Sequence, residues 1–175
     1  MRPVASFFIG MSAPVKAFDE FIPEEYVLIP LEQRHLTLVY LGKINEVKGV
    51  IRLLESIKPQ LRVSRIVFRG LEPFPSYTRP RYLAALPIRE SSELLERVRS
   101  LILGKARFEI RDRYSNFKPH VSIAYTKVKP TLSLLRKLEA VVRRSTRVRE
   151  EITISGISLF KAEGGIIEEM IKIPL

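Results

Sequence analysis

HLTLVYLG at residues 35–42 and HVSIAY at residues 120–125 are the two stretches from which the expected fold of this chain follows. Each begins with a histidine, followed by an apolar residue, a hydroxyl residue and a second apolar residue. Side chains alternate along a β-strand, so histidine and hydroxyl share one face while the apolar residues enter the core. His35 and Thr37, like His120 and Ser122, then lie about 6–7 Å apart at the Cα level, within reach of one tetrahedral anion.

The pattern is informative because it covers every histidine in the chain, which has only two among its 175 residues. A single His-x-Thr in a strand is more often a packed structural histidine than a catalytic one. Two histidines that obey one rule, with no others present, indicate a shared task.

Paired imidazoles suit acid–base chemistry at a phosphate. An unperturbed histidine titrates near ~6.5, so one can be neutral while the other is protonated. The neutral ring removes a proton from an attacking water, and the protonated ring delivers one to the leaving oxygen. The two hydroxyls, with arginines, steady the phosphoryl oxygens. Two histidines without a nearby Asp or Cys make a poor zinc site, so we predict neither a metal nor another cofactor.

Around the two motifs, apolar periodicity and turn residues predict an alternation of strands and helices. Strands are expected at residues 4–11, 27–30, 35–41, 61–68, 81–86, 108–110, 120–126, 152–160 and 166–173. Helices are expected at residues 14–21, 46–57 (with Asn45 as the N-cap), 91–103 and 131–144, and a Pro-rich loop at residues 70–80.

Strands outnumber helices, and their order is not a strict βαβ alternation, which favours an α+β fold with two largely antiparallel sheets and flanking helices. Each half of the chain carries one histidine strand followed by a helix. We therefore expect residues 1–175 to form a single bilobal domain.

Composition narrows the class of partner. Lys and Arg number 30 against 19 Asp and Glu, giving a formal charge of +11 and a pI near 10.1, which favours a polyanion such as nucleic acid. The absence of cysteine excludes disulfides, thiolate metal sites and a cysteine nucleophile. No apolar run approaches the ~20 residues of a membrane helix. The expectation is a cytoplasmic protein without an obligate protein partner.

HLTLVYLG and FKPHVSIAY (117–125) resemble the paired His-x-Thr/Ser-x signatures of the 2H phosphoesterases, most closely the LigT-like RNA 2',3'-cyclic phosphodiesterases, also called 2'-5' RNA ligases. RPVASFFIGM (2–11) resembles that family's first strand, and GLEPFPSYTRPRYLAAL (70–86) its Phe-Pro loop and following strand. The resemblance covers most of the chain.

The resemblance implies a bilobal fold whose motif strands face each other across a central cleft, and hydrolysis of RNA ending in a 2',3'-cyclic phosphate to a 2'-phosphate. His35 and His120 are then the acid–base pair, and Thr37 and Ser122 hold the phosphate. The sequence leaves open which histidine is the acid; our working assignment has His120 activating water and His35 protonating the 3' oxygen. Two alternatives stay open: a non-catalytic module that binds RNA ends, and a reversible 2'-5' RNA ligase.

Four further residues are candidate RNA contacts: Arg79, Arg81, Phe74 and Lys118. The arginines flank Pro80 at the start of a predicted strand, Phe74 is an aromatic that can stack on a terminal base, and Lys118 lies two residues before His120. Tyr125 stands where many members of the family carry arginine. Strand parity predicts that it faces the core, opposite to the second motif's histidine and serine.

Overall fold

The computed structural model describes residues 4–112 and 116–175. The described strands are β1 Ser6–Ser12, β2 Val27–Leu28, β3 His35–Gly42, β4 Arg65–Ser76, β5 Arg79–Pro87, β6 Val121–Tyr125, β7 Arg149–Thr153, β8 Gly156–Glu163 and β9 Ile166–Pro174. The described helices are α1 Val47–Ile57, α2 Arg89–Lys105 and α3 Leu132–Ser145, with 3₁₀ turns η1 Asp19–Phe21, η2 Leu31–Gln33 and η3 Lys58–Gln60.

The strands form an antiparallel sheet in the order β7-β4-β5-β6-β3-β1-β8-β9, with β2 paired to β6. The expected α+β class with antiparallel pairing is confirmed. The two expected sheets are joined, however, into one hydrogen-bonded path. The joint is narrow: β3 and β6 pair at Leu36 and Val121, the second residue of each motif. One half therefore consists of β3, β1, β8 and β9, and the other of β6, β5, β4 and β7.

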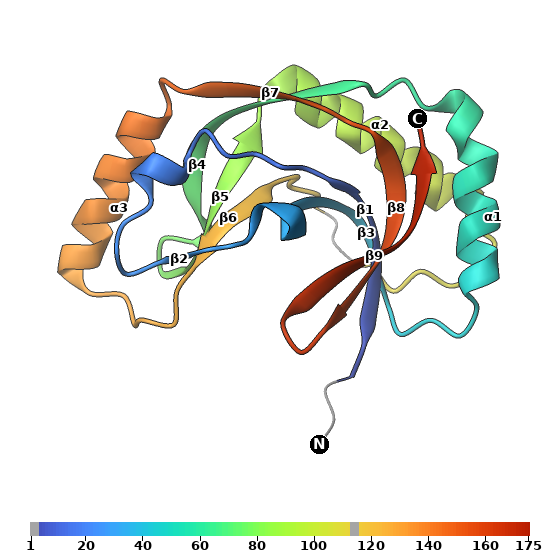
Figure 1. Cartoon of the computed structure of the whole chain (residues 1–175), viewed down its shortest axis with the longest axis horizontal. Helices are drawn as coiled ribbons and strands as arrows, with labels where there is room; N and C mark the ends of the chain where they lie inside the picture. The colour runs from blue at the N-terminus through green and yellow to red at the C-terminus, as the bar shows by residue number, and fades with distance from the viewer. Residues whose placement is uncertain (1–3, 113–115) are drawn as a thin grey trace.

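The three helices lie along the outer side of the curved sheet, with α3 at one end and α1 at the other (Figure 1). Each helix presents an apolar stripe to the sheet at a spacing of three or four residues, because 3.6 residues make one turn. Thr131 caps α3, and its side chain accepts a hydrogen bond from the Leu134 amide at 3.1 Å. The buried residues of the stripes are Val50, Leu53, Leu54 and Ile57 of α1, Leu95, Val98 and Ile102 of α2, and Leu134, Leu138 and Val141 of α3.

The predicted loop at residues 70–80 is wrong. β4 continues to Ser76 and pairs with β5 over this stretch, with Pro73 opposite Leu83. β7 pairs with β4 only as far as Arg69. Beyond that residue β4 is an edge strand, where the missing N–H of a proline leaves no ladder partner unsatisfied.

Other differences are smaller. The strand expected at 152–160 is divided into β7 and β8, residues 108–110 form no strand, and the helix expected at 14–21 is reduced to η1. Helix α1 begins one residue later than expected, with Glu46 rather than Asn45 at the N-cap position. In the part of the chain that the structure describes, no helix is long and apolar enough to cross a membrane.

Candidate active site

The two histidine motifs lie side by side at the joint of the sheet. Leu36 pairs with Val121, so extending the antiparallel register by one residue places His35 opposite Ser122 and Thr37 opposite His120. Directly opposite side chains have Cβ atoms about 4.5–5.5 Å apart. Leu36 and Val121 are fully buried on the other face of the sheet. The structure thus brings the four predicted residues together on one face.

The backbone fixes the orientation of both imidazole rings in the same way. The Nδ1 atom of His35 lies 2.7 Å from the Gln33 carbonyl oxygen, and that of His120 lies 2.8 Å from the Lys118 carbonyl oxygen. A carbonyl oxygen can only accept a hydrogen bond, so each Nδ1 carries the proton and donates. Nε2 is then the atom of each ring left to take or give a proton.

Aromatic packing surrounds His35. Its ring centroid lies 4.7 Å from that of Phe8 and 5.7 Å from that of Phe160. Burial lowers the pKa of His35 from its usual 6.5, because a charged imidazolium loses hydration there, while the hydrogen bond to Gln33 acts in the opposite direction. Burial therefore favours a neutral His35.

His120 lies in a different setting. The Phe74 ring stacks on it with centroids 3.8 Å apart. Burial lowers the pKa of His120, the hydrogen bond to Lys118 partly opposes this, and positive charge on His35 and on the Lys118 ammonium lowers the pKa further. A proton on one histidine thus disfavours a proton on the other. The pair therefore favours one protonated and one neutral ring, which is the state that acid–base catalysis by two histidines requires.

A pocket of about 410 Å³ opens beside His120 and Thr37. Its wall combines aromatic and charged side chains, as small-ligand sites commonly do. The other lining residues are Leu38, Tyr40, Phe74, Pro75, Arg99, Asp112, Asn116, Phe117 and Lys118.

A buried ion pair in this wall escaped the sequence reasoning. Arg99 of α2 and Asp112 are 2.9 Å apart, with side chains only 9% and 3% exposed. Arg99 also donates to the Leu38 carbonyl at 2.7 Å, and Asp112 accepts from the Tyr40 amide at 2.7 Å. The ion pair therefore forms hydrogen bonds with backbone groups of β3 that lie beyond the residue where β3 pairs with β6. The overlooked signal was an arginine on the apolar stripe of α2.

The four candidate RNA contacts divide into two groups. Phe74 and Lys118 line the pocket, where Phe74 packs on His120 and the Lys118 ammonium lies 3.0 Å from the Glu72 carboxylate. Arg79 and Arg81 are exposed but do not line it. Ala84 pairs with Ser122 and shares its face of the sheet, and alternation along β5 places Arg81 on the other face. A contact between Arg81 and RNA therefore stays a prediction.

The prediction that Tyr125 faces the core is wrong. This tyrosine is 37% exposed rather than part of the core, and it pairs with Tyr82 of β5. The register between β5 and β6 shifts between Leu83 and Ala84, where β6 contains one extra residue. Such a bulge reverses the alternation beyond it and turns Tyr125 to the face of Ser122.

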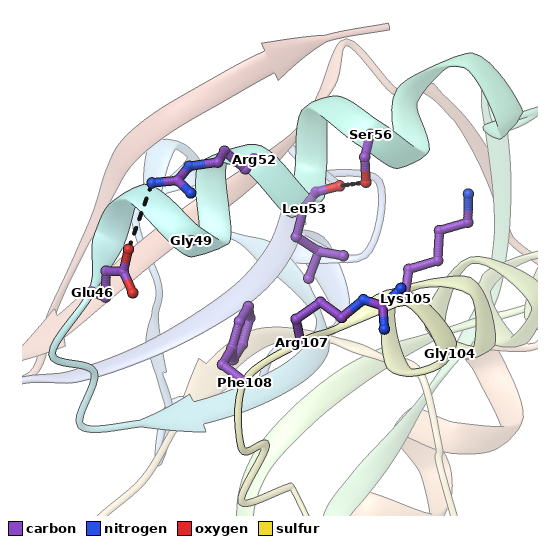
Figure 2. A pocket seen from close by; sticks show the side chains of 9 residues that line it. All are labelled: Glu46, Gly49, Arg52, Leu53, Ser56, Gly104, Lys105, Arg107 and Phe108. Atoms are coloured by element: carbon purple, nitrogen blue, oxygen red, sulfur yellow. Dashed lines mark hydrogen bonds and ion pairs between the residues drawn. The ribbon is translucent and has the colours of Figure 1, made fainter.

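A larger hollow of about 540 Å³ lies elsewhere, between α1 and the end of α2, with Arg107 and Lys105 beside it (Figure 2). Neither histidine lines it. Among residues 4–112 and 116–175, no three side chains of the His, Cys, Asp and Glu types gather as metal ligands would.

Known proteins place this arrangement in a family. The 2'-5' RNA ligase superfamily matches residues 13–166. An RNA 2',3'-cyclic phosphodiesterase of Aquifex aeolicus (strain VF5) is 34% identical over 113 residues, which cover 61% of this chain and 60% of that protein. The match thus spans less than two thirds of that relative's length.

Solved structures show the same fold. TT0787 of Thermus thermophilus has a TM-score of 0.65 at 21% identity and covers 97% of each chain. E. coli LigT in complex with 3'-AMP has a TM-score of 0.59 at 15% identity, covering 99% of this chain and 98% of that one. The fold is that of the LigT-like 2H phosphoesterases. The chain belongs to the 2'-5' RNA ligase superfamily.

Proposed function

We propose that this protein is an RNA 2',3'-cyclic phosphodiesterase that opens a terminal cyclic phosphate to a 2'-phosphate by two-histidine acid–base catalysis. The observation that carries the proposal is the register of β3 and β6, which gathers His35, Thr37, His120 and Ser122 on one face. The cyclic phosphodiesterase activity of the Aquifex aeolicus relative supports it.

The reaction uses the free Nε2 atoms. His120 takes a proton from a water molecule as the water oxygen forms a bond to phosphorus. The bond between phosphorus and O3' breaks, and His35 gives its Nε2 proton to O3'. The product carries a 2'-phosphate and a 3'-hydroxyl. His120 then holds the extra proton and His35 lacks one, so exchange with solvent restores the starting state.

The hydroxyls of Thr37 and Ser122 donate hydrogen bonds to the non-bridging phosphoryl oxygens. Each hydroxyl lies opposite the histidine of the other motif, so the phosphorus sits between two matched pairs of groups. Charge on these oxygens grows as water attacks, and donors already in place stabilise it without reorganisation.

The surroundings favour His120 as the base. The Lys118 ammonium lowers the pKa of His120, and no such cation acts on His35 among the causes of its shift. This repulsion favours the neutral form of His120, the form that accepts a proton from water. An anionic phosphate between the rings favours an imidazolium on either side, and the Lys118 ammonium opposes that proton at His120.

The proton transfers and hydrogen bonds of this mechanism use protein side chains alone, so we propose that it needs no metal. The charge of +11 suits RNA as the substrate, since cationic surface contributes much of nucleic-acid affinity.

The test is an oligonucleotide with a 2',3'-cyclic phosphate end, incubated with the protein in excess EDTA. Conversion to a 2'-phosphate end is expected. A 3'-phosphate product, or turnover that requires an added divalent metal, contradicts the proposal. Binding without product indicates an RNA-end-binding module. Joining to a second RNA with a 5'-hydroxyl, instead of hydrolysis, indicates a 2'-5' ligase.

A further inference from the structure

A second hollow adjoins the one shown in Figure 2 and extends it along α1. The first, of about 540 Å³, lies between α1 and the end of α2, and the second, of about 220 Å³, lies beside Leu41 of β3. Glu46, Gly49 and Phe108 line both hollows. The two therefore form one groove, which we call the α1–α2 groove.

The α1–α2 groove leads to the candidate active-site pocket. Leu41 lines the groove, and its neighbour Tyr40 lines the pocket. On the segment that follows α2, Arg111 lines the groove and its neighbour Asp112 lines the pocket. From Lys105 to Asp112 the chain advances seven residues, which span at most about 25 Å. A chain molecule whose end occupies the pocket can therefore continue into the groove.

Cations outnumber carboxylates along the α1–α2 groove. The charged residues that line it are Lys43, Arg52, Lys105, Arg107 and Arg111, with Glu46 and Glu109. The Glu46 carboxylate lies 3.7 Å from the Arg52 guanidinium. Among the residues that the structure describes, none of the other four cations forms an ion pair or a side-chain hydrogen bond. Arg107 extends toward Lys105 (Figure 2). The groove therefore holds positive charge that no carboxylate neutralises.

The helix dipole accounts for only one of these unpaired cations. Lys105 is in the last turn of α2, where the partial negative charge of the helix end favours a cation. Arg107 and Arg111 lie beyond the end of that helix, and Lys43 precedes α1. The dipole gives no reason for the position of these three.

Two glycines leave the walls of the groove open. Gly49 of α1 and Gly104 of α2 lie inside helices, where glycine is less stable than alanine. Neither has a positive φ. A Cβ at Gly104 would meet nothing within 4 Å, and one at Gly49 would lie 3.8 Å from the Glu46 carboxylate, an ordinary contact. Packing within the protein therefore requires neither glycine, whereas both allow a ligand's backbone to approach closely.

We propose that the α1–α2 groove binds the phosphate backbone of the RNA chain that precedes the terminal nucleotide. This inference rests on the proposed function, because it places the cyclic phosphate between the two histidines. The unpaired cations contact phosphates of the chain, and such contacts carry no preference for base sequence. A long RNA is then bound more tightly than a short one, because only the long chain extends from the pocket into the groove.

The overall charge makes a different prediction. A diffuse positive field of +11 also attracts a long RNA more strongly than a short one. Under that field alone, the loss of any three exposed cations would weaken binding equally. The groove predicts that the position of the lost cations decides the effect.

The experiment measures, by calorimetry at several salt concentrations, the affinity for a dinucleotide and a decanucleotide that each end in a 2'-phosphate. The test variant combines Lys105→Gln, Arg107→Gln and Arg111→Gln. Each phosphate contact with a single strand contributes about 0.7 to the slope of log K against log salt, so the variant should lose about 2 from this slope on the decanucleotide. On a fourfold rise in salt, native binding should thus weaken about 20-fold more than variant binding.

Two further variants serve as controls, and a melting curve checks the fold of each protein. Arg143→Gln, Arg144→Gln and Arg147→Gln together remove the same charge beside the end of α3, at the opposite end of the molecule from α1 (Figure 1), and should keep the native slope. The second control exchanges lysine and arginine at the three groove positions. It keeps the charge and should also keep the native slope.

A decanucleotide that binds the native protein no more tightly than the dinucleotide overturns the inference. An equal loss of slope in the groove variant and the α3 variant does so too, as does a loss in the charge-conserving variant. The two proposals fail in different ways. If cyclic-phosphate ends are hydrolysed but the slope does not depend on the groove cations, only the groove is wrong. If the groove variant loses slope but no cyclic phosphate is hydrolysed, the groove stands and the proposed reaction is wrong.

Discussion

The motif at His35 lies within a strand, whereas the motif at His120 begins one residue before its strand. On the β1 side, β3 is paired along most of its length, from Gly42 back to His35 itself. β6 starts at Val121, so His120 lies just before the strand. Its position is fixed by the Phe74 ring that stacks on it and by the hydrogen bond from its Nδ1 to the Lys118 carbonyl. The same four-residue pattern therefore rests on two kinds of support.

Two histidines at equivalent positions of their motifs therefore have different surroundings. Both histidines use Nδ1 in the same hydrogen bond, so the backbone does not distinguish them. Their neighbours do. Two aromatic rings pack beside His35, while one aromatic ring, a cation and a pocket adjoin His120. We expect the acid and the base to differ through these surroundings.

Removing either imidazole should have the largest effect. In His35→Ala and His120→Ala, kcat on a cyclic-phosphate oligonucleotide should fall by about 10²–10⁴-fold, the usual contribution of a general acid or base. Circular dichroism and a cooperative melting curve serve as controls for folding. Native turnover in either variant would refute the pairing.

A change of leaving group sharpens the comparison between the two motifs. A cyclic phosphate with sulfur in place of O3' releases a thiolate, which departs without a proton. The loss in His35→Ala should therefore shrink strongly on this substrate, because the missing acid is no longer needed. His120→Ala should stay defective, since water still requires a base. The opposite pattern would exchange the two roles.

The hydroxyls come next in size. Thr37→Val and Ser122→Ala should each lower kcat by about a hundredfold, the low end for one donor to a developing oxyanion. Thr153→Val on the exposed part of β7 is the matched control and should leave kcat unchanged. Losses confined to KM would mean that the hydroxyls bind the ground state only.

The ion pair beside His120 should show in stability. Arg99→Met leaves the Asp112 carboxylate buried without its guanidinium partner, which costs about 3–5 kcal/mol. For a chain of this length, that lowers the melting temperature by about 10 °C. Arg97→Met, on the exposed side of the same helix, should change it little. Equal melting temperatures for the two variants would contradict a stabilising role for the pair.

The sequence was sufficient for the elements that obey strict periodicity. The alternation of apolar and polar residues located β3 and β6. Apolar residues recurring every three or four positions located α1, α2 and α3. It also placed the two hydroxyls beside the two histidines, because residues i and i+2 of any strand share a face.

Features that depend on pairing between distant strands could not be read in this way. The bulge that turns Tyr125 outward exists only relative to β5. The prolines of β4 suggested a loop because nothing in the sequence shows that β7 ends its pairing at Arg69. Arg99 and Asp112 meet only after α2 has packed on β3. Each is a tertiary outcome that overrides a local preference.

Convergence of both imidazoles on one phosphate can be observed directly by NMR, because the chain contains only two histidines. Their Cε1 protons give two signals to follow against pH. In the free protein both should titrate below 6.5, since burial lowers the pKa of each ring. Adding a nucleoside 2'-phosphate should raise both pKa values, because the anion favours each imidazolium. A response from one histidine alone, or from neither, would contradict the account.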